Sequence, residues 1–186
     1  MGIGELLDSI RDFYLEKFAS QIEELQGNLT IIVEPALLTK DGEYAIEGEL
    51  GLPYRTDIIT TQNGEVVDSL MVDTEEMLSF QGINFEWQDE FQVEMLPFQW
   101  NFCPCEMQNG PENPDWMNIK DWFFKWFEEH ELDDPHFNGC LHYMSDPKME
   151  GDRYKIDIDL GSAPVEAFEE LLDAIAATGF SAMRIG

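Results

Sequence analysis

Three cysteines and one histidine have residue types and spacing that could bind a metal ion. Cys103 and Cys105 are two residues apart, and so are Cys140 and His142. Residues i and i+2 of a β-strand share one face, so the members of each pair could point in the same direction. If the two strands were neighbours, three sulfur atoms and one imidazole could form a tetrahedral zinc site. These four residues are the predicted metal ligands, and zinc is the cofactor they would suit.

The same cysteines also have a simpler interpretation as packed core residues. Free cysteine is among the residue types most often buried. Structural zinc sites usually pair their ligands as C-x2-C or H-x3-H, whereas this chain offers C-x-C and C-x-H. Packing alone is therefore the competing explanation, and a protein without a cofactor is the default expectation.

A second pair that could do chemistry is Asp157 and Asp159, which precede Gly161 and Ser162 at the expected start of a helix. Two carboxylates on one face of a strand could hold Mg²⁺ or act as acid and base. Similar acid pairs recur on other predicted strands, which favours plain solvent-facing positions. A functional pair needs convergent geometry that strand alternation alone does not supply.

A row of acids forms the third candidate site. From Phe85 to Met95 apolar and polar residues alternate, which predicts a strand with one core face and one face of carboxylates and amides. Glu86, Glu90 and Glu94 lie on that polar face. Like charges on neighbouring strands are destabilising. Solubility with protection of sheet edges, or adaptation to a salty interior, would also explain such a row. The functional prediction is that the row binds a basic protein, with Asp157 and Asp159 contributing if their strand shares the face.

The elements that must position these residues follow from hydrophobic periodicity. Apolar residues recur at helical spacing from Ile3 to Gln26, which predicts the first helix. Strand patterns follow, separated by Asp41-Gly42 and Asn63-Gly64, dipeptides typical of tight hairpin turns. The predicted strands of this antiparallel meander are residues 29–33, 43–50, 55–61 and 65–72. The spacing of residues 73–76 matches a capping box, which predicts a short helical turn up to Phe80.

An aromatic helix is predicted after a loop rich in Asn, Gly and Pro at residues 108–114. Asn113 is its expected N-cap, and the helix should end near His130. Its aromatic residues, Trp122 and Trp126 among them, cover more than one helical stripe. They either pack in the core or contact a partner, because Trp is enriched at protein interfaces.

The C-terminal third has the pattern β-β-α-β. Its predicted elements are strands at 137–144 and 153–160, a helix at 164–177 capped by Ser162 and stopped by Gly179, and a strand at 180–185. Strands joined through a helix should be parallel. The fold class is therefore α+β: a mixed, mostly antiparallel sheet with about three main helices packed largely on one face. The expected organisation is one globular domain over residues 1–186, with a subdivision conceivable near 108–114.

The composition is strongly acidic and yet typical of a folded protein. The chain of 186 residues has 39 Asp and Glu against 10 Lys and Arg, for a net charge of −29, and Thr56 to Ile119 contains no cationic residue. A hydrophobic content of 44% with 12% aromatics excludes disorder. The charge repels nucleic acid and anionic membranes, so neither is an expected partner. Basic proteins and metal ions are the expected partners, and the oligomeric state is left open.

The chain start and the cysteine content indicate a compartment. The first residues lack the basic start and apolar run of a signal peptide, and no stretch has the length of a membrane span. Three cysteines do not make a disulfide framework in a chain of this length. A cytoplasmic location is therefore expected.

The predicted function is that of a non-catalytic acidic protein that captures a basic protein partner through an anionic sheet face. Inhibitors, immunity proteins and DNA mimics share this physical logic, in which carboxylates stand in for phosphates. The chain lacks the common signatures of nucleophilic, zinc-protease and phosphate-binding sites, so enzymatic activity is the less favoured reading. The alternatives are a metal-dependent hydrolase or zinc-stabilised domain that uses the Cys/His cluster or the paired Asp, and a structural subunit of an assembly.

Overall fold

The computed structural model describes residues 2–25, 27, 29–72, 76–88 and 90–186. Its largest unit is a seven-stranded sheet of β6 (Ile83–Trp87), β7 (Phe91–Met95), β8 (Cys103–Gln108), β9 (Tyr143–Met144), β10 (Lys148–Glu150), β11 (Arg153–Asp159) and β12 (Ala182–Ile185). The strand order is β10-β11-β8-β12-β7-β6, and β9 pairs with the end of β11. β12 is parallel to β7 and antiparallel to β8, which confirms the predicted mixed, mostly antiparallel sheet.

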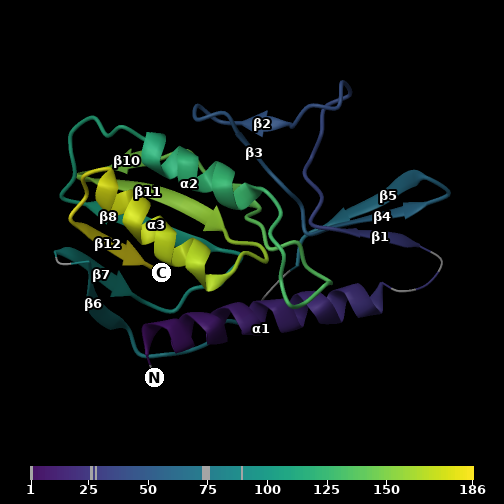
Figure 1. Cartoon of the computed structure of the whole chain (residues 1–186), viewed down its shortest axis with the longest axis horizontal. Helices are drawn as coiled ribbons and strands as arrows, with labels where there is room; N and C mark the ends of the chain where they lie inside the picture. The colour runs from purple at the N-terminus through teal and green to yellow at the C-terminus, as the bar shows by residue number, and fades with distance from the viewer. Residues whose placement is uncertain (1, 26, 28, 73–75, 89) are drawn as a thin grey trace.

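Two smaller sheets lie beside the large one. β1 (Thr30–Val33), β4 (Ile58–Gln62) and β5 (Glu65–Leu70) form an antiparallel sheet in the order β1-β4-β5. It projects from one end of the molecule, while β2 (Ile46–Glu47) and β3 (Leu52–Pro53) form a separate short arm (Figure 1). The predicted turn between β4 and β5 is confirmed, because Asn63 and Gly64 have φ angles of 54° and 83°.

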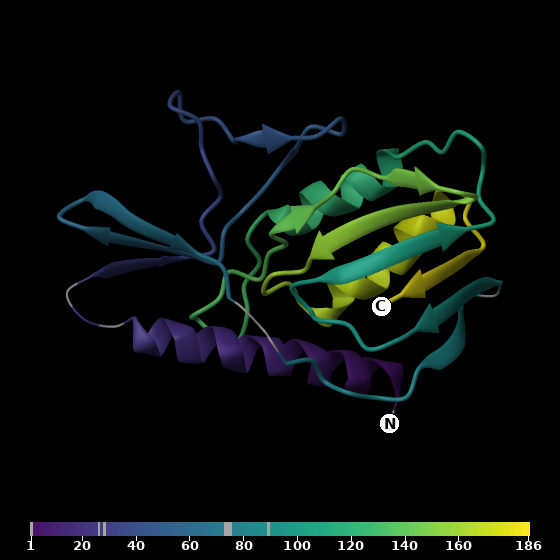
Figure 2. The same cartoon turned by 180° about the vertical axis from the view of Figure 1, so that it is seen from behind.

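Three helices complete the α+β fold, as the sequence predicted. α2 (Met117–Phe127) and α3 (Val165–Ala177) lie side by side over one face of the large sheet (Figure 1), and no helix of the described residues covers the opposite face (Figure 2). α1 (Ile3–Glu24) extends along both the large and the three-stranded sheet. Packed aromatic rings, including the stacked Phe98, Trp100 and Phe168, fill the core between helices and sheet. Complete burial of each such side chain contributes about 1.5–3 kcal/mol.

The strand expected over residues 85–95 is a hairpin of β6 and β7. Gln88 and Glu90 in its turn have φ angles of 42° and 144°, values for which glycine would be the usual signal. The apolar alternation continues in phase through the turn, because Phe85 pairs with Val93 in the hairpin. Two antiparallel strands therefore have the same sequence pattern as one long strand.

Several element boundaries also differ from the prediction. Only residues 46–47 of the expected strand 43–50, and only 143–144 of the expected strand 137–144, belong to named strands. α2 begins at Met117, whose backbone N–H is accepted by the Asp115 carboxylate, so Asn113 is not its N-cap. The capping box falls mostly on residues 73–75, which lie outside the described residues, and residues 76–80 are not helical. β11 and β12 are parallel as predicted, but β8 lies between them.

Candidate functional site

Three buried carboxylates and one buried imidazole meet where the three-stranded sheet joins the large sheet. They are Glu34 after β1, Asp57 before β4, His142 before β9 and Asp159 at the end of β11, and we call them the His142 centre. The first three are 0% exposed and Asp159 is 6% exposed. Burying an ionised group costs several kcal/mol unless it is paired and hydrogen-bonded. Residues from four distant segments must therefore be arranged to satisfy one another.

On one side of the imidazole, Glu34 is fully hydrogen-bonded. Its Oε1 lies 2.7 Å from Nε2 of His142 and accepts the backbone N–H of Ser162 at 3.0 Å. Its Oε2 accepts the Ser162 hydroxyl at 2.8 Å and the backbone N–H of Asn138 at 2.6 Å. The chain adopts a φ of 53° at Glu34, a strained value for a residue with a side chain. Such strain persists only where surrounding contacts hold it.

On the other side, Nδ1 of His142 faces two carboxylates. It lies 2.7 Å from Oδ1 of Asp57, which accepts the Tyr14 hydroxyl at 3.4 Å, and 3.8 Å from Oδ2 of Asp159, and it is hydrogen-bonded to neither carboxylate. The second oxygen of Asp57 accepts the backbone N–H of Val72 at 2.5 Å. Oδ1 of Asp159 accepts the backbone N–H of Gly161 at 2.9 Å. Nδ1 is therefore a buried polar atom held against negative charge.

Ser162 belongs to this centre and not to a helix cap. Its hydroxyl donates to Glu34 and accepts the backbone N–H groups of Gly139 at 2.8 Å and Cys140 at 3.4 Å. The N-cap of α3 is Pro164. The predicted N-cap role of Ser162 was wrong because the buried carboxylate of Glu34 competes for its hydroxyl.

The buried charges shift one another's pKa values. Burial alone would lower the pKa of His142, but the charge of Asp159 and the contacts with Asp57, Cys140 and Glu34 raise it well above its usual value. Burial raises the pKa of Asp159 to about 7, while the charge of His142 opposes this shift and that of Asp57 adds to it. Burial also acts to raise the pKa of Glu34, but its hydrogen bonds with His142, Ser162 and Asn138 hold it below its usual value.

One further buried cation, Arg55, lies beside the centre and has other partners. Its Nε and Nη2 donate to the carbonyl oxygen of Phe127 at 3.2 and 3.0 Å, and its Nη1 donates to the carbonyl oxygen of Glu34 at 2.6 Å. Its guanidinium also lies 4.6 Å from the centre of the Phe127 ring. Arg55 therefore makes its described hydrogen bonds to backbone carbonyls and not to the three carboxylates.

A pocket of about 440 Å³ adjoins the centre. Arg55, Asp157 and Asp159 line it together with aromatic and apolar residues that include Tyr54, Met71, Phe102 and Tyr143. This volume lies within the range of small-molecule pockets. Asp159 thus connects the buried centre with a partly apolar pocket, and both members of the predicted Asp157 and Asp159 pair reach it. Asp157 itself is exposed and does not share the burial of Asp159.

The four predicted zinc ligands are divided between two places. Cys103 and Cys105 point into the core from β8, with their sulfur atoms 3.8 Å apart. β11 pairs with β8 on one side and with β9, just after His142, on the other. β8 and β9 are thus separated by β11 and lie about 10 Å apart, which is too far for their side chains to share an ion. The predicted four-ligand cluster is therefore wrong as a set.

His142 instead belongs to two groups that could hold a metal ion. Among the described residues, Glu34, Cys140 and His142 form one group, and Asp57, His142 and Asp159 form the other. Within each group the possible ligand atoms lie within 4.8 Å of one another, and all these residues are buried. Cys140 and His142 are the members shared with the prediction.

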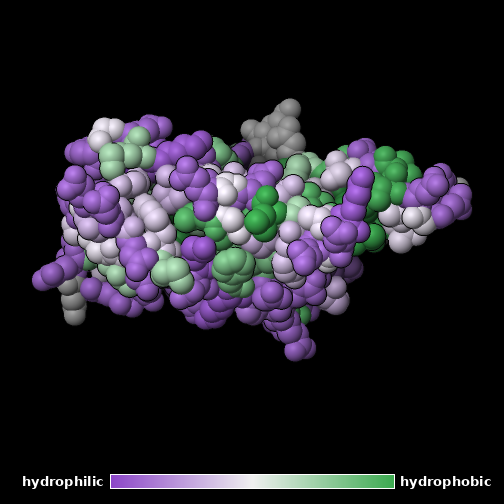
Figure 3. Space-filling model, turned by 90° about the horizontal axis from the view of Figure 1, so that it is seen from above, coloured by the Kyte–Doolittle hydropathy of each residue, from purple (hydrophilic) through white to green (hydrophobic). Residues whose placement is uncertain are grey.

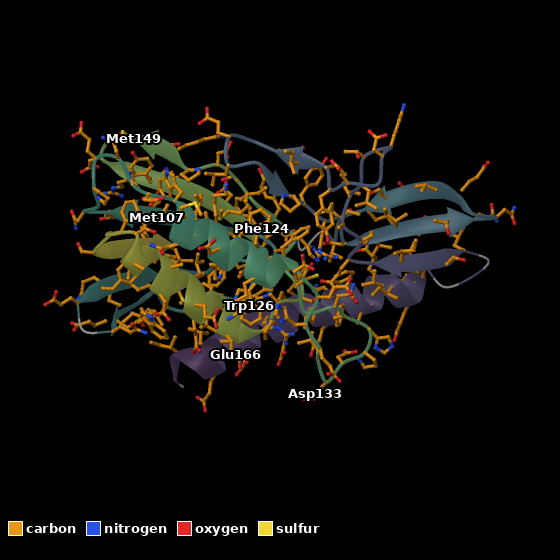
Figure 4. All side chains as sticks on the ribbon, turned by 45° about the horizontal axis from the view of Figure 1, so that its top comes forward. Met107, Phe124, Trp126, Asp133, Met149 and Glu166 are labelled. Carbon is orange, nitrogen blue, oxygen red and sulfur yellow. The ribbon has the colours of Figure 1, made fainter. Side chains whose placement is uncertain are left out.

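A second candidate site is a groove of about 540 Å³ between α1, the loop after α2 and the start of α3, which we call the acidic groove. Its six exposed carboxylates belong to Asp8, Asp12, Glu16, Asp133, Asp134 and Glu166. Figure 4 shows Asp133 and Glu166 on the side of the molecule along which α1 runs. Arg11, the cation among its lining residues, donates to the carbonyl oxygens of Ala163 at 2.9 Å and Ser162 at 3.0 Å.

The open face of the large sheet is less anionic than predicted. Glu86 and Glu94 are exposed on it, and Glu90 is exposed in the turn. Glu94 lies 3.5 Å from Arg184, however, and further along the same face Glu106 pairs with Arg153 at 2.9 Å and Lys155 at 3.2 Å. Cations and acids alternate across β7, β12, β8 and β11. The expected row of unrelieved carboxylates is therefore a mixed surface.

In the view from above, hydrophilic residues predominate, and hydrophobic ones gather near the three-stranded sheet (Figure 3).

The two predicted partner-binding tryptophans lie between α2 and α3. Trp122 and Trp126 are 5% and 7% exposed. The indole N–H of Trp122 donates to the carbonyl oxygen of Ala167 at 2.7 Å, and that of Trp126 donates to Glu170 at 2.9 Å. Figure 4 shows Trp126 directed toward α3. Burial and paired indole groups leave little of either side chain for a partner.

Glu34 and Asp57 were not identified from the sequence. Each is an acid at the end of an apolar strand segment, Glu34 directly after Val33 and Asp57 directly before Ile58. That position was the available signal, because an acid adjoining a buried strand must find a partner. The sequence does not indicate that His142 is this partner, because His142 is 108 residues from Glu34 in the chain.

Comparison of the chain with protein-family models, curated proteins and solved structures finds no match. In the part of the chain that the structure describes, no helix combines the length and apolar character needed to cross a membrane.

Proposed function

We propose that the protein is a non-catalytic binding protein that captures a basic segment of a partner protein, and that the acidic groove receives this segment. The observation that carries the proposal is the convergence of six exposed carboxylates on one groove. The net charge of −29 adds a long-range field that would speed the approach of a cationic partner.

The charges of the acidic groove are not explained by local stability. Asp8, Asp12 and Glu16 recur every four residues along α1, so they are neighbours on its surface. Like charges at this spacing destabilise a helix by about 0.2–0.5 kcal/mol per pair. Arg11, 3.9 Å from Asp12, offsets part of this repulsion, but it is one cation among six carboxylates in the lining of the groove. A basic ligand would remove this repulsion.

The floor of the acidic groove suits the side chains of such a ligand. Leu15, Leu132, Phe137 and Val165 line it between the acids. Lys and Arg side chains pack their aliphatic stems on apolar surface while their charged ends pair with acids. The alternation of apolar floor and acidic rim therefore favours a segment rich in Lys or Arg over a simple inorganic cation.

We expect the triple substitution Asp8→Asn, Asp12→Asn, Glu16→Gln to weaken binding of a fluorescein-labelled octalysine peptide by at least about tenfold, or 1.4 kcal/mol. Fluorescence anisotropy titrations at low and moderate salt would measure this loss. Wild-type binding should weaken as salt rises, since the contacts are exposed charge pairs.

The matched control is Glu86→Gln, Glu90→Gln, Glu94→Gln on β6, β7 and their turn. It removes the same number of charges at another place, so it separates a local site from net charge. The control should change the affinity by less than about threefold, the effect expected of distant screened charges. If it weakened binding as much as the triple substitution on α1 does, the acidic groove would not be the binding surface.

A second candidate function is the binding of a zinc ion, favoured by the burial of His142 among possible ligands. Imidazole, thiolate and carboxylate are all zinc ligands. Elemental analysis of protein purified without added zinc should then find about one equivalent, as a single site predicts. Less than about a tenth of an equivalent, with no change of thermal midpoint in chelator, would exclude a tightly bound ion.

A further inference from the structure

The two nitrogens of the His142 imidazole differ in hydrogen bonding: Nε2 is hydrogen-bonded to Glu34, and Nδ1 is not hydrogen-bonded to the carboxylates beside it. Nε2 lies 2.7 Å from a Glu34 oxygen that is held by further hydrogen bonds. Nδ1 has no hydrogen-bond partner among the described residues, although the side chain is 0% exposed. Histidine ligands of metal ions commonly donate their second N–H to a carboxylate, which fixes the ring and directs the other nitrogen to the ion. Glu34 stands in that relation to His142.

We propose that Nδ1 of His142, Oδ1 of Asp57 and Oδ2 of Asp159 bind a divalent transition-metal ion beside the 440 Å³ pocket, which Asp159 lines. The proposal rests on metal binding as the second candidate function and names its ligands. Two ligands about 2.1 Å from one ion are about 3.0–3.4 Å apart at angles of 90–109°. The distances of 2.7 Å and 3.8 Å from Nδ1 to the two carboxylates bracket this range. Small side-chain movements would therefore complete the coordination.

The charges around the centre fit a divalent ion. When Nδ1 coordinates a metal and Nε2 keeps its proton, His142 is neutral. The centre then has three carboxylates, on Glu34, Asp57 and Asp159, and Arg55 is the neighbouring cation. Three negative charges and one positive charge, which Arg55 also presents to the exposed Glu129 at 3.6 Å, leave at least two negative charges, and one divalent ion balances two. Buried charge without such compensation is costly.

The competing group on the Nε2 side suits an ion less well. Both oxygens of Glu34 accept hydrogen bonds of 2.6–3.0 Å from Ser162 and Asn138, which a metal there would have to displace. On the Nδ1 side, the hydrogen bond from the Tyr14 hydroxyl to Oδ1 of Asp57 is longer, at 3.4 Å. Neither Cys140 nor Glu34 lines the pocket, and Asp57 and His142 are equally buried, so Asp159 is the proposed ligand that reaches it. Asp159 does line it, so an ion at the Nδ1 side has an entry path. Three protein ligands would leave a coordination position for water or a ligand, as in catalytic zinc sites.

The test uses Zn²⁺ and Co²⁺ as probes with chelator-treated, desalted full-length protein. We expect calorimetry to find one Zn²⁺ site that Asp57→Asn and Asp159→Asn each weaken by at least about 100-fold, because even outer partners typically contribute 10–100-fold. Asp157→Asn is the matched control, since Asp157 lies two residues away and lines the same pocket. It should change the affinity by less than about threefold, as expected of a residue outside the coordination shell.

Co²⁺ gives a second measurement that needs no substitution. The wild-type cobalt form should show d–d absorption of nitrogen and oxygen ligation without a thiolate charge-transfer band. Absence of any metal binding would overturn both the ligand assignment and the second candidate function. Binding with a thiolate band, abolished by Cys140→Ala and retained in Asp159→Asn, would keep the metal function but reject these ligands.

Discussion

Replacement of Glu34 by alanine is expected to lower the free energy of unfolding by about 3–5 kcal/mol, the range for removing one partner of a buried ion pair. The Glu34 carboxylate is the acceptor for His142, for Asn138 and for both the backbone N–H and the hydroxyl of Ser162. Alanine would leave these donors unsatisfied in the interior and His142 next to a cavity. Urea denaturation at pH 7 measures the loss.

Two variants delimit this prediction. Glu131→Ala removes an exposed carboxylate and should change stability by less than about 0.5 kcal/mol. Glu34→Gln retains one acceptor oxygen and the side-chain volume but removes the charge that faces His142, so it should fall between alanine and wild type. A loss below about 1 kcal/mol for Glu34→Ala would contradict the view that this carboxylate organises the centre.

The stability of the metal-free protein is expected to fall as the pH rises from 5 to 8, and Asp159 is the main cause. Its pKa of about 7 in the folded protein exceeds the unfolded value, which is about 3.9. The folded state therefore holds this proton more tightly, and its contribution is complete below pH 4 and lost by about pH 7. A shift of this size corresponds to about 4 kcal/mol.

Two other residues of the His142 centre, His142 and Glu34, have shifted pKa values and also affect how stability depends on pH. The pKa of His142 is raised, so its contribution is present below about pH 6.5 and is lost as the pH rises through the folded value. The pKa of Glu34 is lowered, so its contribution is lost only on acidification below its unfolded value of about 4.3. His142 and Asp159, whose pKa values are raised, therefore both lower the free energy of unfolding as the pH rises between 5 and 8.

Asp159→Asn isolates the contribution of Asp159. Urea denaturation in EDTA should find the variant more stable than wild type at pH 8 by about 2–4 kcal/mol, with a much flatter dependence between pH 5 and 7. Asp157→Asn, on the exposed side of β11, should keep the wild-type dependence. Parallel curves for wild type and Asp159→Asn would show that the carboxyl of Asp159 does not titrate in this range.

The sequence predicted the helical framework well because local periodicity determines it. α1 and α3 bury apolar residues at helical spacing, such as Leu7, Ile10 and Phe18 in α1. Gly179 ends α3 with a φ of 100°, a conformation that glycine adopts without strain. The hairpin of β6 and β7 was missed because its turn contains no glycine. Local patterns therefore identified the elements more reliably than their connections.

The candidate site was only partly predictable. His142, Asp157 and Asp159 were singled out, but the partners assigned to His142 were Cys103 and Cys105. The pairing order of β8, β11 and β9 separates these cysteines from His142, and strand spacing patterns do not determine that order. The acidic groove joins residues of α1 with residues near position 166, and no sequence pattern links such distant segments.

The His142 centre also has a consequence for the order in which the chain folds during synthesis. Glu34 and Asp57 lie in the first third of the chain, but Glu34 is hydrogen-bonded to His142, 108 residues later, and to Ser162, 128 residues later. Contacts of such high sequence separation slow folding. In a ribosome-bound chain that ends before β9, Glu34 and Asp57 have no His142 to pair with, so their carboxylates must stay in contact with water. This requirement opposes the packing that buries them beside the three-stranded sheet. The N-terminal sheet is therefore expected to reach its final packing only after the last third of the protein has been made.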